Sequence, residues 1–191
     1  MGKLYCIMGK SASGKDTIFS KIMQEMPELK TYLTYTTRPK REFEEEGVNY
    51  HYVSPEILDG FEAQGKLIEK RVYNTIHGPW IYATVDDGQI DLDKYSYLVP
   101  ATLVSYEKLK EYFGSERTEP IYIEVEDGIR LMRALKREMQ EDVPKYKELC
   151  RRFLADSEDF SEDALTRAHI SKRYNNIDFE ACVAEILKDM R

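Results

Sequence analysis

A glycine-rich segment near the N-terminus constrains the fold of this 191-residue chain more than any other feature. Residues 9–15 have the sequence GKSASGK and fit the pattern G-x-x-x-x-G-K, in which backbone N–H groups and the lysine hold phosphate oxygens. An apolar run at residues 4–8 predicts a buried strand before it, and apolar residues at helical spacing follow it as far as Pro27. Strand, glycine loop and helix in this order predict a phosphate loop. The plainer alternative is a glycine turn with an exposed lysine.

The residue after this loop departs from the pattern. Asp16 stands where a Ser or Thr hydroxyl would bind Mg²⁺. A carboxylate is also a hard oxygen ligand, so we hypothesise that Asp16 binds the metal, and we expect Lys15 to reach the β- and γ-phosphates. Thr17 lies about 100° further round the helix and is a poor substitute. The predicted nucleotide-binding residues of this segment are Gly9, Ser11, Ala12, Ser13, Gly14, Lys15, Asp16 and Thr17.

The rest of the sequence pattern predicts an α/β chain with a β-rich segment between two helix–strand parts. Pro144 interrupts a long charged helical segment, and Asp178 caps the last helix. Strands are expected within 31–53 around a charged loop, at 66–73 and 80–85 joined by 76–79, and at 96–99, 120–125 and 168–174. Helices are expected at 55–64, 102–112, 127–160 and 178–190.

The charge and composition exclude several classes of function. A net charge of −7 argues against a nucleic-acid polymer as partner. Neither a 20-residue apolar run nor a signal-peptide pattern is present, so we expect a cytoplasmic protein without a membrane partner. The three cysteines and three histidines are scattered, which predicts reduced thiols and no structural metal site.

A second cluster of polar residues follows the first helix. Arg38 and Arg41 lie three residues apart, with threonine and tyrosine hydroxyls on either side. Guanidinium groups bind phosphate by paired hydrogen bonds, so this segment could hold a phosphate monoester. A solvated basic loop is the alternative.

Several motifs in register resemble the guanylate kinase family. They are the glycine loop, T-x-T-T-R-x-x-R at 34–41, Glu44, Gly47, Y-x-Y-V-S at 50–54, Leu67-Ile68-Glu69 and W-I-Y-A-T at 80–84. The resemblance implies an α/β fold: a P-loop kinase core with a parallel sheet flanked by helices, a mixed β-rich insert that binds the nucleoside monophosphate, and a helical lid. The implied core comprises 1–32, 92–126 and 162–191, the insert 33–91 and the lid 127–161.

The resemblance also implies an activity and a set of site residues. The activity is Mg²⁺-dependent phosphoryl transfer from ATP to GMP or dGMP, giving ADP and GDP, by a monomer or weak homodimer. Guanine presents two adjacent donors that a carboxylate matches. The implied acceptor residues are Arg38, Arg41, Tyr50 and Tyr82 for the phosphate, Glu44 beside these arginines, and Glu69, Thr34 and Thr84 for the base. On the donor side they are Lys15, the lid residues Arg133, Arg137 and Arg152 (or Arg151), and Asn175 or Asn176 near adenine.

Two departures keep other functions open. The family has acidic residues after its central strand, whereas this chain has Val-Pro-Ala-Thr at 99–102. This loss and Asp16 favour a kinase that resembles ribose 1,5-bisphosphate phosphokinases, in which G-K-D also occurs. The motif block at 34–50 and Glu69 favour a nucleotide acceptor instead. A third possibility is a non-catalytic guanylate-kinase-like binding module, although such modules typically lose the phosphate loop that is present here.

Overall fold

A computed structural model describes residues 2–75 and 78–191, and its strands form two four-stranded sheets. The first, which we call the core sheet, is wholly parallel and has the order β6-β1-β7-β8. Its strands are β1 (Leu4–Met8), β6 (Tyr97–Pro100), β7 (Thr118–Glu124) and β8 (Arg173–Asn175). Strand β1, which leads into the glycine loop, is therefore one of the two inner strands, as its uninterrupted apolar sequence predicts.

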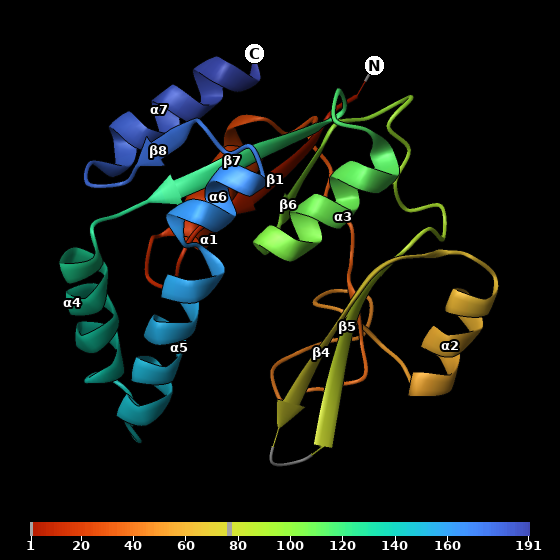
Figure 1. The fold of residues 1–191 in the computed structure, drawn as a ribbon, viewed down its shortest axis with the longest axis horizontal. Coiled ribbons are helices and arrows are strands. Elements are labelled where there is room, and N and C mark those ends of the chain that lie inside the picture. The colour runs from red at the N-terminus through yellow and green to blue at the C-terminus, as the bar shows by residue number, and fades with distance from the viewer. Residues whose placement is uncertain (1, 76–77) are drawn as a thin grey trace.

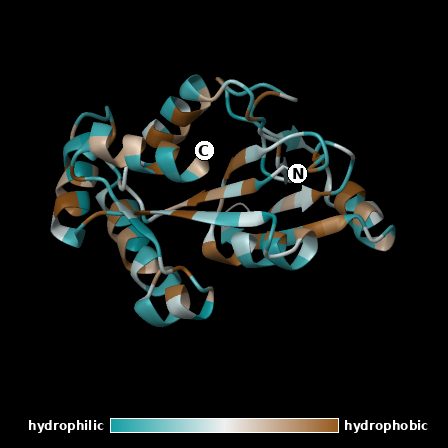
Figure 2. Ribbon diagram, turned by 90° about the horizontal axis from the view of Figure 1, so that it is seen from above, coloured by the Kyte–Doolittle hydropathy of each residue, from teal (hydrophilic) through white to brown (hydrophobic). Residues whose placement is uncertain are grey.

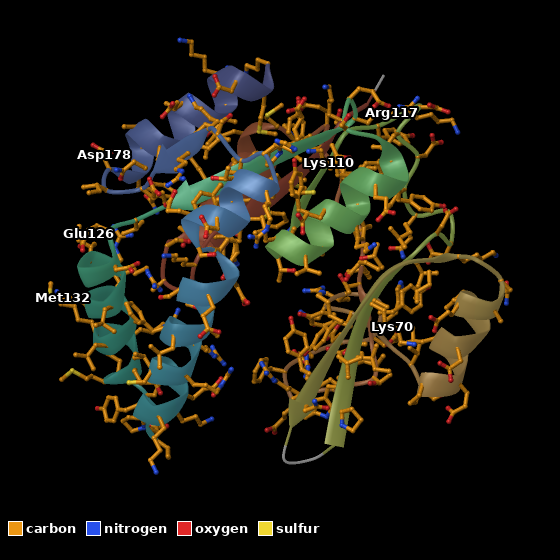
Figure 3. All side chains as sticks on the ribbon, in the orientation of Figure 1. Lys70, Lys110, Arg117, Glu126, Met132 and Asp178 are labelled. Atoms are coloured by element: carbon orange, nitrogen blue, oxygen red, sulfur yellow. The ribbon has the colours of Figure 1, made fainter. Side chains whose placement is uncertain are left out.

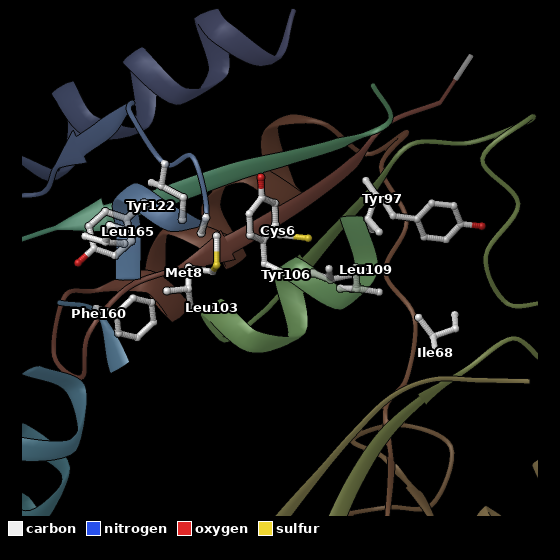
Figure 4. Packing of buried hydrophobic residues seen from close by; sticks show 14 of the residues in the cluster. Cys6, Met8, Ile68, Tyr97, Leu103, Tyr106, Leu109, Tyr122, Phe160 and Leu165 are labelled. Atoms are coloured by element: carbon white, nitrogen blue, oxygen red, sulfur yellow. The ribbon is translucent and has the colours of Figure 1, made fainter. Parts of the chain in front are cut away.

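Helices cover both faces of the core sheet (Figure 1). Alternate residues of β1 point to opposite faces, so Cys6 and Met8 pack toward α3 (Leu103–Phe113) and α6 (Glu162–Arg167), as Figure 4 shows for the surrounding cluster. Ile7 packs instead with α1 (Lys15–Glu25) and α7 (Phe179–Met190). Coloured by hydropathy, the strands between these helices carry apolar segments together with polar ones (Figure 2). The predicted fold class, a parallel sheet flanked by helices with a separate mixed sheet, is confirmed.

The second sheet has the order β3-β2-β5-β4 and is mixed. Its strands are β2 (Tyr35–Thr36), β3 (His51–Tyr52), β4 (Leu67–Thr75) and β5 (Gly78–Val85). Strand β2 is parallel to β3 and antiparallel to β5, which pairs with β4. Helix α2 (Pro55–Ala63) packs Leu58 against one face. Of the predicted connection at 76–79, residues 76–77 lie outside the described residues.

Two segments connect this second sheet to the core, and they lie side by side. The Gln89 side chain accepts a hydrogen bond from the Leu33 N–H (2.9 Å) and donates to the Leu33 carbonyl (3.4 Å). The backbone carbonyl of Gln89 accepts a hydrogen bond from the Tyr97 hydroxyl of β6 (2.9 Å). One amide side chain therefore joins the outgoing and the returning connection, as a backbone neighbour would in a sheet.

A pair of helices follows β7. Helices α4 (Asp127–Glu138) and α5 (Tyr146–Asp159) contact each other, and Pro144 lies in the turn between them, as predicted. In Figure 1 this pair and the second sheet both extend to the same side of the core sheet. The division of the chain into core, insert and lid at the boundaries given above remains our proposal.

One predicted element is wrong. A strand was expected at 168–174, but α6 occupies residues 162–167 and β8 covers only residues 173–175. The Ser161 side chain caps α6 by accepting from the Ala164 N–H, and two acidic residues in its first turn favour a helix. Ala168 and Ile170 are buried in the cluster beneath α3 without extending the strand.

Candidate active site

The glycine loop makes a tight turn between β1 and α1. Ala12 and Gly14 have φ angles of 63° and 86°, in the left-handed region. A Cβ atom added at Gly14 would lie 2.3 Å from Nδ2 of Asn176, and one at Gly9 would lie 2.7 Å from the Ile123 carbonyl oxygen. Both positions therefore need glycine, because a side chain would collide with the groups that pack against the loop.

Two polar groups of this loop have features expected of an anion site. Ser13 is buried, and among the described residues its hydroxyl has no hydrogen-bond partner. The Ser11 backbone N–H donates to a side chain of another element, Oδ2 of Asp156 on α5 (2.7 Å). A carboxylate oxygen thus lies where a phosphate oxygen would lie in a phosphate loop.

The two charged residues that end the loop are paired with each other. Nζ of Lys15 lies 2.6 Å from Oδ1 of Asp16, whose side chain is 87% exposed. Thr17 is exposed as well. The Asp16 carboxylate at the start of α1 is therefore accessible from solvent. Within residues 2–75 and 78–191, no three His, Cys, Asp or Glu side chains gather as a metal site of their own.

A buried arginine, which the sequence did not lead us to expect, joins the helix pair to the loop. Arg130 of α4 is 1% exposed and donates to Asp127 (2.6 Å) and Asp156 (3.3 Å). Asp127 also meets Nζ of Lys10 in the loop (3.4 Å). The hydrogen bond from Arg130 lowers the pKa of Asp127. In the described structure, Nη2 of Arg130 is buried without a partner. In the sequence, the i, i+3 spacing of Asp127 and Arg130 was the feature that indicated this ion pair.

The predicted lid arginines have different surroundings. Arg137 and Arg152 line a cavity of about 80 Å³ between α4 and α5, together with Arg130 and Ser11 of the loop. Arg152 donates to Glu148 (2.8 Å) and is otherwise largely exposed. Arg137 and Arg152, two of the predicted lid arginines, thus lie beside the glycine loop.

Arg133 does not line this cavity and contacts the turn before α7 instead. Its Nη2 donates to the Asn176 carbonyl (2.9 Å), and Nδ2 of Asn176 donates to the Ser13 carbonyl (2.7 Å). Asn175 is exposed, and its side chain accepts from the Ile177 N–H. Of the two asparagines considered, the structure brings Asn176 to the loop and leaves Asn175 outside it.

The second sheet carries a buried ion pair in the predicted acceptor region. Arg38 donates to both carboxylate oxygens of Glu44, at 2.8 and 2.9 Å. Glu44 also accepts from the Tyr52 hydroxyl and the Arg41 N–H. Four donors fill the capacity of a carboxylate. The hydrogen bonds from Arg38 lower the pKa of Glu44 to about 2.

Two tyrosines, Tyr82 and Tyr50, lie beside Arg38. Nε of Arg38 donates to the Tyr82 hydroxyl (3.0 Å), and the Tyr82 ring meets that of Tyr50 edge to face at 5.8 Å. The Arg41 side chain is exposed at the surface. Predicted residues Arg38, Glu44, Tyr50 and Tyr82 therefore form one cluster, and Arg41 is attached to it by its backbone.

Glu69 lies on the same sheet and has a partner that the sequence did not predict. Arg71 donates to both of its oxygens, from Nε (3.0 Å) and Nη2 (3.1 Å), and the Thr84 hydroxyl adds a third hydrogen bond (3.1 Å). Residues two apart on a strand share a face, so the spacing of Glu69 and Arg71 in the sequence was the feature that indicated this contact. Thr34 is half-buried just before β2, and its carbonyl accepts from the His51 N–H.

Comparisons with known proteins point to one family. Residues 1–86 match the family model described as Guanylate kinase. The chain is 36% identical over 78 residues to a guanylate kinase of Syntrophotalea carbinolica, covering 40% of this chain and 37% of that protein. It is 34% identical over 87 residues to a guanylate kinase of Neisseria gonorrhoeae, covering 46% and 40%. The chain thus spans about two fifths of the length of these curated relatives.

A solved structure extends the likeness to the whole chain. The crystal structure of guanylate kinase from Anaplasma phagocytophilum matches with a TM-score of 0.66, covering 100% of this chain and 85% of that one. At 16% identity, this likeness concerns the fold. No helix in the described part of the chain is both long and apolar enough to cross a membrane.

Proposed function

We propose that this chain, whose residues 1–86 match the Guanylate kinase family model, transfers the γ-phosphoryl group of ATP to GMP or dGMP, giving ADP and GDP. The observation that supports this proposal is the presence of two separate groups of residues whose chemistry suits an anion. One is the glycine loop with its unpartnered buried Ser13 hydroxyl, and the other is the Arg38–Tyr82 cluster on the second sheet. A phosphoryl transfer between two phosphates needs both.

On the donor side, the loop and the helix pair would hold ATP. Backbone N–H groups of residues 10–15 and the Ser13 hydroxyl would surround the phosphates, with Lys15 released from Asp16 to reach them. Gly9, Ala12 and Gly14 supply the turn, and Asn176 supports it in place of the predicted Asn175. Arg137 and Arg152, with Arg130 behind them, would offset charge on the transferred group, and Arg133 would fix the adjoining turn.

On the acceptor side, four of the five N–H groups of Arg38 donate to Glu44, Tyr82 and the Pro39 carbonyl. Its contribution to a bound phosphate is therefore its fixed charge and one remaining N–H. The exposed Arg41 guanidinium would supply paired hydrogen bonds, and the Tyr82 and Tyr50 hydroxyls would add donors. Glu69, Thr84 and Thr34 would contact the base.

Catalysis by these residues is positional and electrostatic, and no covalent intermediate is needed. When Mg²⁺ is bound, it would supply positive charge that offsets the negative charge of the phosphates. Asp16 fits that ion as a single accessible carboxylate ligand, since Mg²⁺ commonly takes one or two carboxylates plus phosphate oxygens. The lid over the loop would exclude water, which would otherwise hydrolyse ATP.

The first test is an ADP-release assay with ATP and each of GMP, dGMP, AMP, UMP and ribose 1,5-bisphosphate. We expect turnover with GMP and dGMP, and a loss of about 100-fold or more in kcat for Lys15→Met, because that variant removes a charged phosphate contact. Lys66→Met, an exposed lysine before β4, is the matched control. Turnover with only the sugar bisphosphate would contradict the proposal. GMP binding without any turnover would identify a binding module instead.

The second test concerns Asp16. If it binds Mg²⁺, Asp16→Ala raises the Mg²⁺ concentration needed for half-maximal rate by about tenfold, because one hard oxygen ligand is lost. Asp16→Ser restores a hydroxyl ligand and should recover much of that loss. The measurement is a Mg²⁺ titration of the rate, together with calorimetry of ATP binding at each Mg²⁺ concentration. Unchanged titrations for both variants would exclude Asp16 as a ligand.

We also predict that the protein is cytoplasmic and acts as a monomer or weak homodimer, without a nucleic-acid polymer or membrane as partner.

A further inference from the structure

The acceptor region contains a second charged side chain that faces the same way as Glu69. Glu69 pairs with Thr84 and Arg71 with Tyr82 across the β4–β5 ladder, so all four side chains share one face of the sheet. Arg71 therefore stands between Glu69, at the expected base end, and the Arg38–Tyr82 cluster, at the expected phosphate end. Lys70 between them points to the opposite face, where it meets Glu62 (2.7 Å).

The hydrogen-bond capacity of Glu69 limits what it can do for a base. A carboxylate accepts about four hydrogen bonds, and Glu69 already accepts three. Two of these fall on Oε1, from Arg71 and Thr84, and one on Oε2, from Arg71. One position on Oε2 remains, whereas the N1–H and 2-amino groups of guanine together need two. With Arg71 in place, Glu69 cannot receive both donors.

Arg71, unlike Glu69, has both exposed surface and several unused hydrogen-bonding groups. Its side chain is 23% exposed, against 2% for Glu69, so the accessible part of the pair belongs mostly to Arg71. A guanidinium carries five N–H groups, and Arg71 uses two on Glu69 and also interacts with Tyr73. N–H groups remain for a ligand. The pair thus presents one acceptor position next to several donors.

We propose that Glu69 and Arg71 recognise the acceptor base together, and that the substrate class is 6-oxopurine nucleoside monophosphates, IMP as well as GMP. This inference rests on the proposed function. Glu69 accepts from N1–H of the base, and Arg71 donates to the adjacent O6, as arginine does at guanine in nucleic acids. Hypoxanthine shares this edge with guanine. Adenine carries an acceptor at N1 and a donor at N6, the reverse arrangement.

The 2-amino group, which distinguishes guanine from hypoxanthine, has no assigned acceptor in this scheme. Residues 99–102 contain no acid that could provide one. A single neutral hydrogen bond is worth about a factor of ten. We therefore expect kcat/KM for GMP and IMP to agree within about tenfold. We expect AMP to be poorer by about 1,000-fold or more, because its N1 acceptor would face the Glu69 carboxylate and its N6 donor would face the Arg71 guanidinium.

The first experiment compares kcat/KM for GMP, IMP and AMP with the unmodified protein. A preference for GMP over IMP of more than about 100-fold would overturn the inference and leave the proposed function standing. The absence of turnover with every nucleotide would overturn the proposed function itself, and the inference with it.

The second experiment uses Arg71→Met, which keeps an unbranched side chain and removes the donors. It frees both oxygens of Glu69 for the guanine edge, so the GMP-to-IMP ratio of kcat/KM should rise about tenfold while the protein stays folded. A purely structural role would lower both values equally and leave the ratio unchanged, which would contradict the inference. Lys70→Met, on the opposite face of the same strand (labelled in Figure 3), is the matched control.

If Arg71→Met fails to fold because the buried Glu69 carboxylate has lost its cationic partner, a double variant tests the proposal instead. Glu69→Gln/Arg71→Met removes both charges together. It should lose the preference for GMP and IMP over AMP, measured as kcat/KM or as binding of each nucleotide by calorimetry. Retention of the full preference over AMP would show that neither residue contacts the base.

Discussion

At the scale of single residues, the proposed acceptor region contains two buried carboxylates, Glu44 and Glu69. Glu44 is saturated by four donors and therefore fixes Arg38 without a position left for a substrate. Glu69 keeps one position free beside Arg71. The same residue type thus acts as a support in one place and, in our proposal, as a base contact in the other.

The pKa of Glu44 makes stability depend on pH. Its folded value of about 2 lies below the unfolded value of about 4.3. The unfolded state therefore binds the proton more strongly, so this contribution is present above about pH 4.3 and is lost as the pH falls toward 2. Glu44→Gln should lower the Tm at pH 7 and flatten its decrease between these values. Thermal melts from pH 7 to pH 2.5 measure both effects.

The matched control for this prediction is Glu45→Gln, which changes the exposed neighbour in the same loop. It should leave the Tm profile close to that of the unmodified protein. If Glu44→Gln gave a curve parallel to the original one, the hydrogen bonds from Arg38 would contribute nothing that depends on the protonation of Glu44.

Residue-scale features were predictable where the contact is local or fixed by a motif. The glycine loop needed Gly9 and Gly14, and the structure shows the close approaches that require them. The distant residues that contact this loop were not predictable. Asp156 meets Ser11 from 145 positions away, and Asn176 meets Ser13 from 163 positions away. Such contacts follow from the packing of whole elements, which one sequence does not specify.

At the scale of elements, capping residues gave the most reliable boundaries. Asp178 was predicted to begin the last helix, and its side chain accepts from the Ala181 N–H (3.0 Å). Thr102 and Ser105 form a reciprocal cap at the start of α3. The missed helix α6 also has a capping serine, but its six residues carry too little periodicity to outweigh the apolar residues that follow.

The Asp178 cap predicts a measurable stability. Asp178→Ala should destabilise the protein by about 1 kcal/mol, because the first turn of α7 loses an acceptor and a favourable charge. For a chain of this length that is a fall of about 2–4 °C in Tm. Glu180→Gln, an exposed residue in the same turn, is the control and should change the Tm less. Asp178, labelled in Figure 3, lies at the outer end of α7, away from the second sheet.

At the scale of the whole molecule, charged side chains connect the helix pair to the glycine loop. The connection passes from Lys10 through Asp127 and Arg130 to Asp156, which returns to the loop at Ser11. In the proposed function, a phosphate of ATP needs the same Ser11 N–H that Asp156 now occupies. The position of α5 and the binding of nucleotide are therefore coupled through one hydrogen bond.

This coupling predicts that Asp156→Asn lowers the KM for ATP several-fold, because the variant removes a charge that competes with and repels phosphate. It should also lower the Tm, since Arg130 then keeps only one carboxylate partner in the described structure. The measurements are steady-state kinetics with varied ATP and a thermal melt. Glu158→Gln, an exposed acid on the same helix, is the control. An unchanged or higher KM would show that Asp156 does not compete with nucleotide.

The Gln89 side chain has a mechanical consequence. Because its amide joins the two connections at Leu33, neither connection can bend alone without breaking that link. In the proposed function, a movement of the second sheet toward the glycine loop would therefore bend both connections together. It would carry the Arg38–Tyr82 cluster with it as one unit.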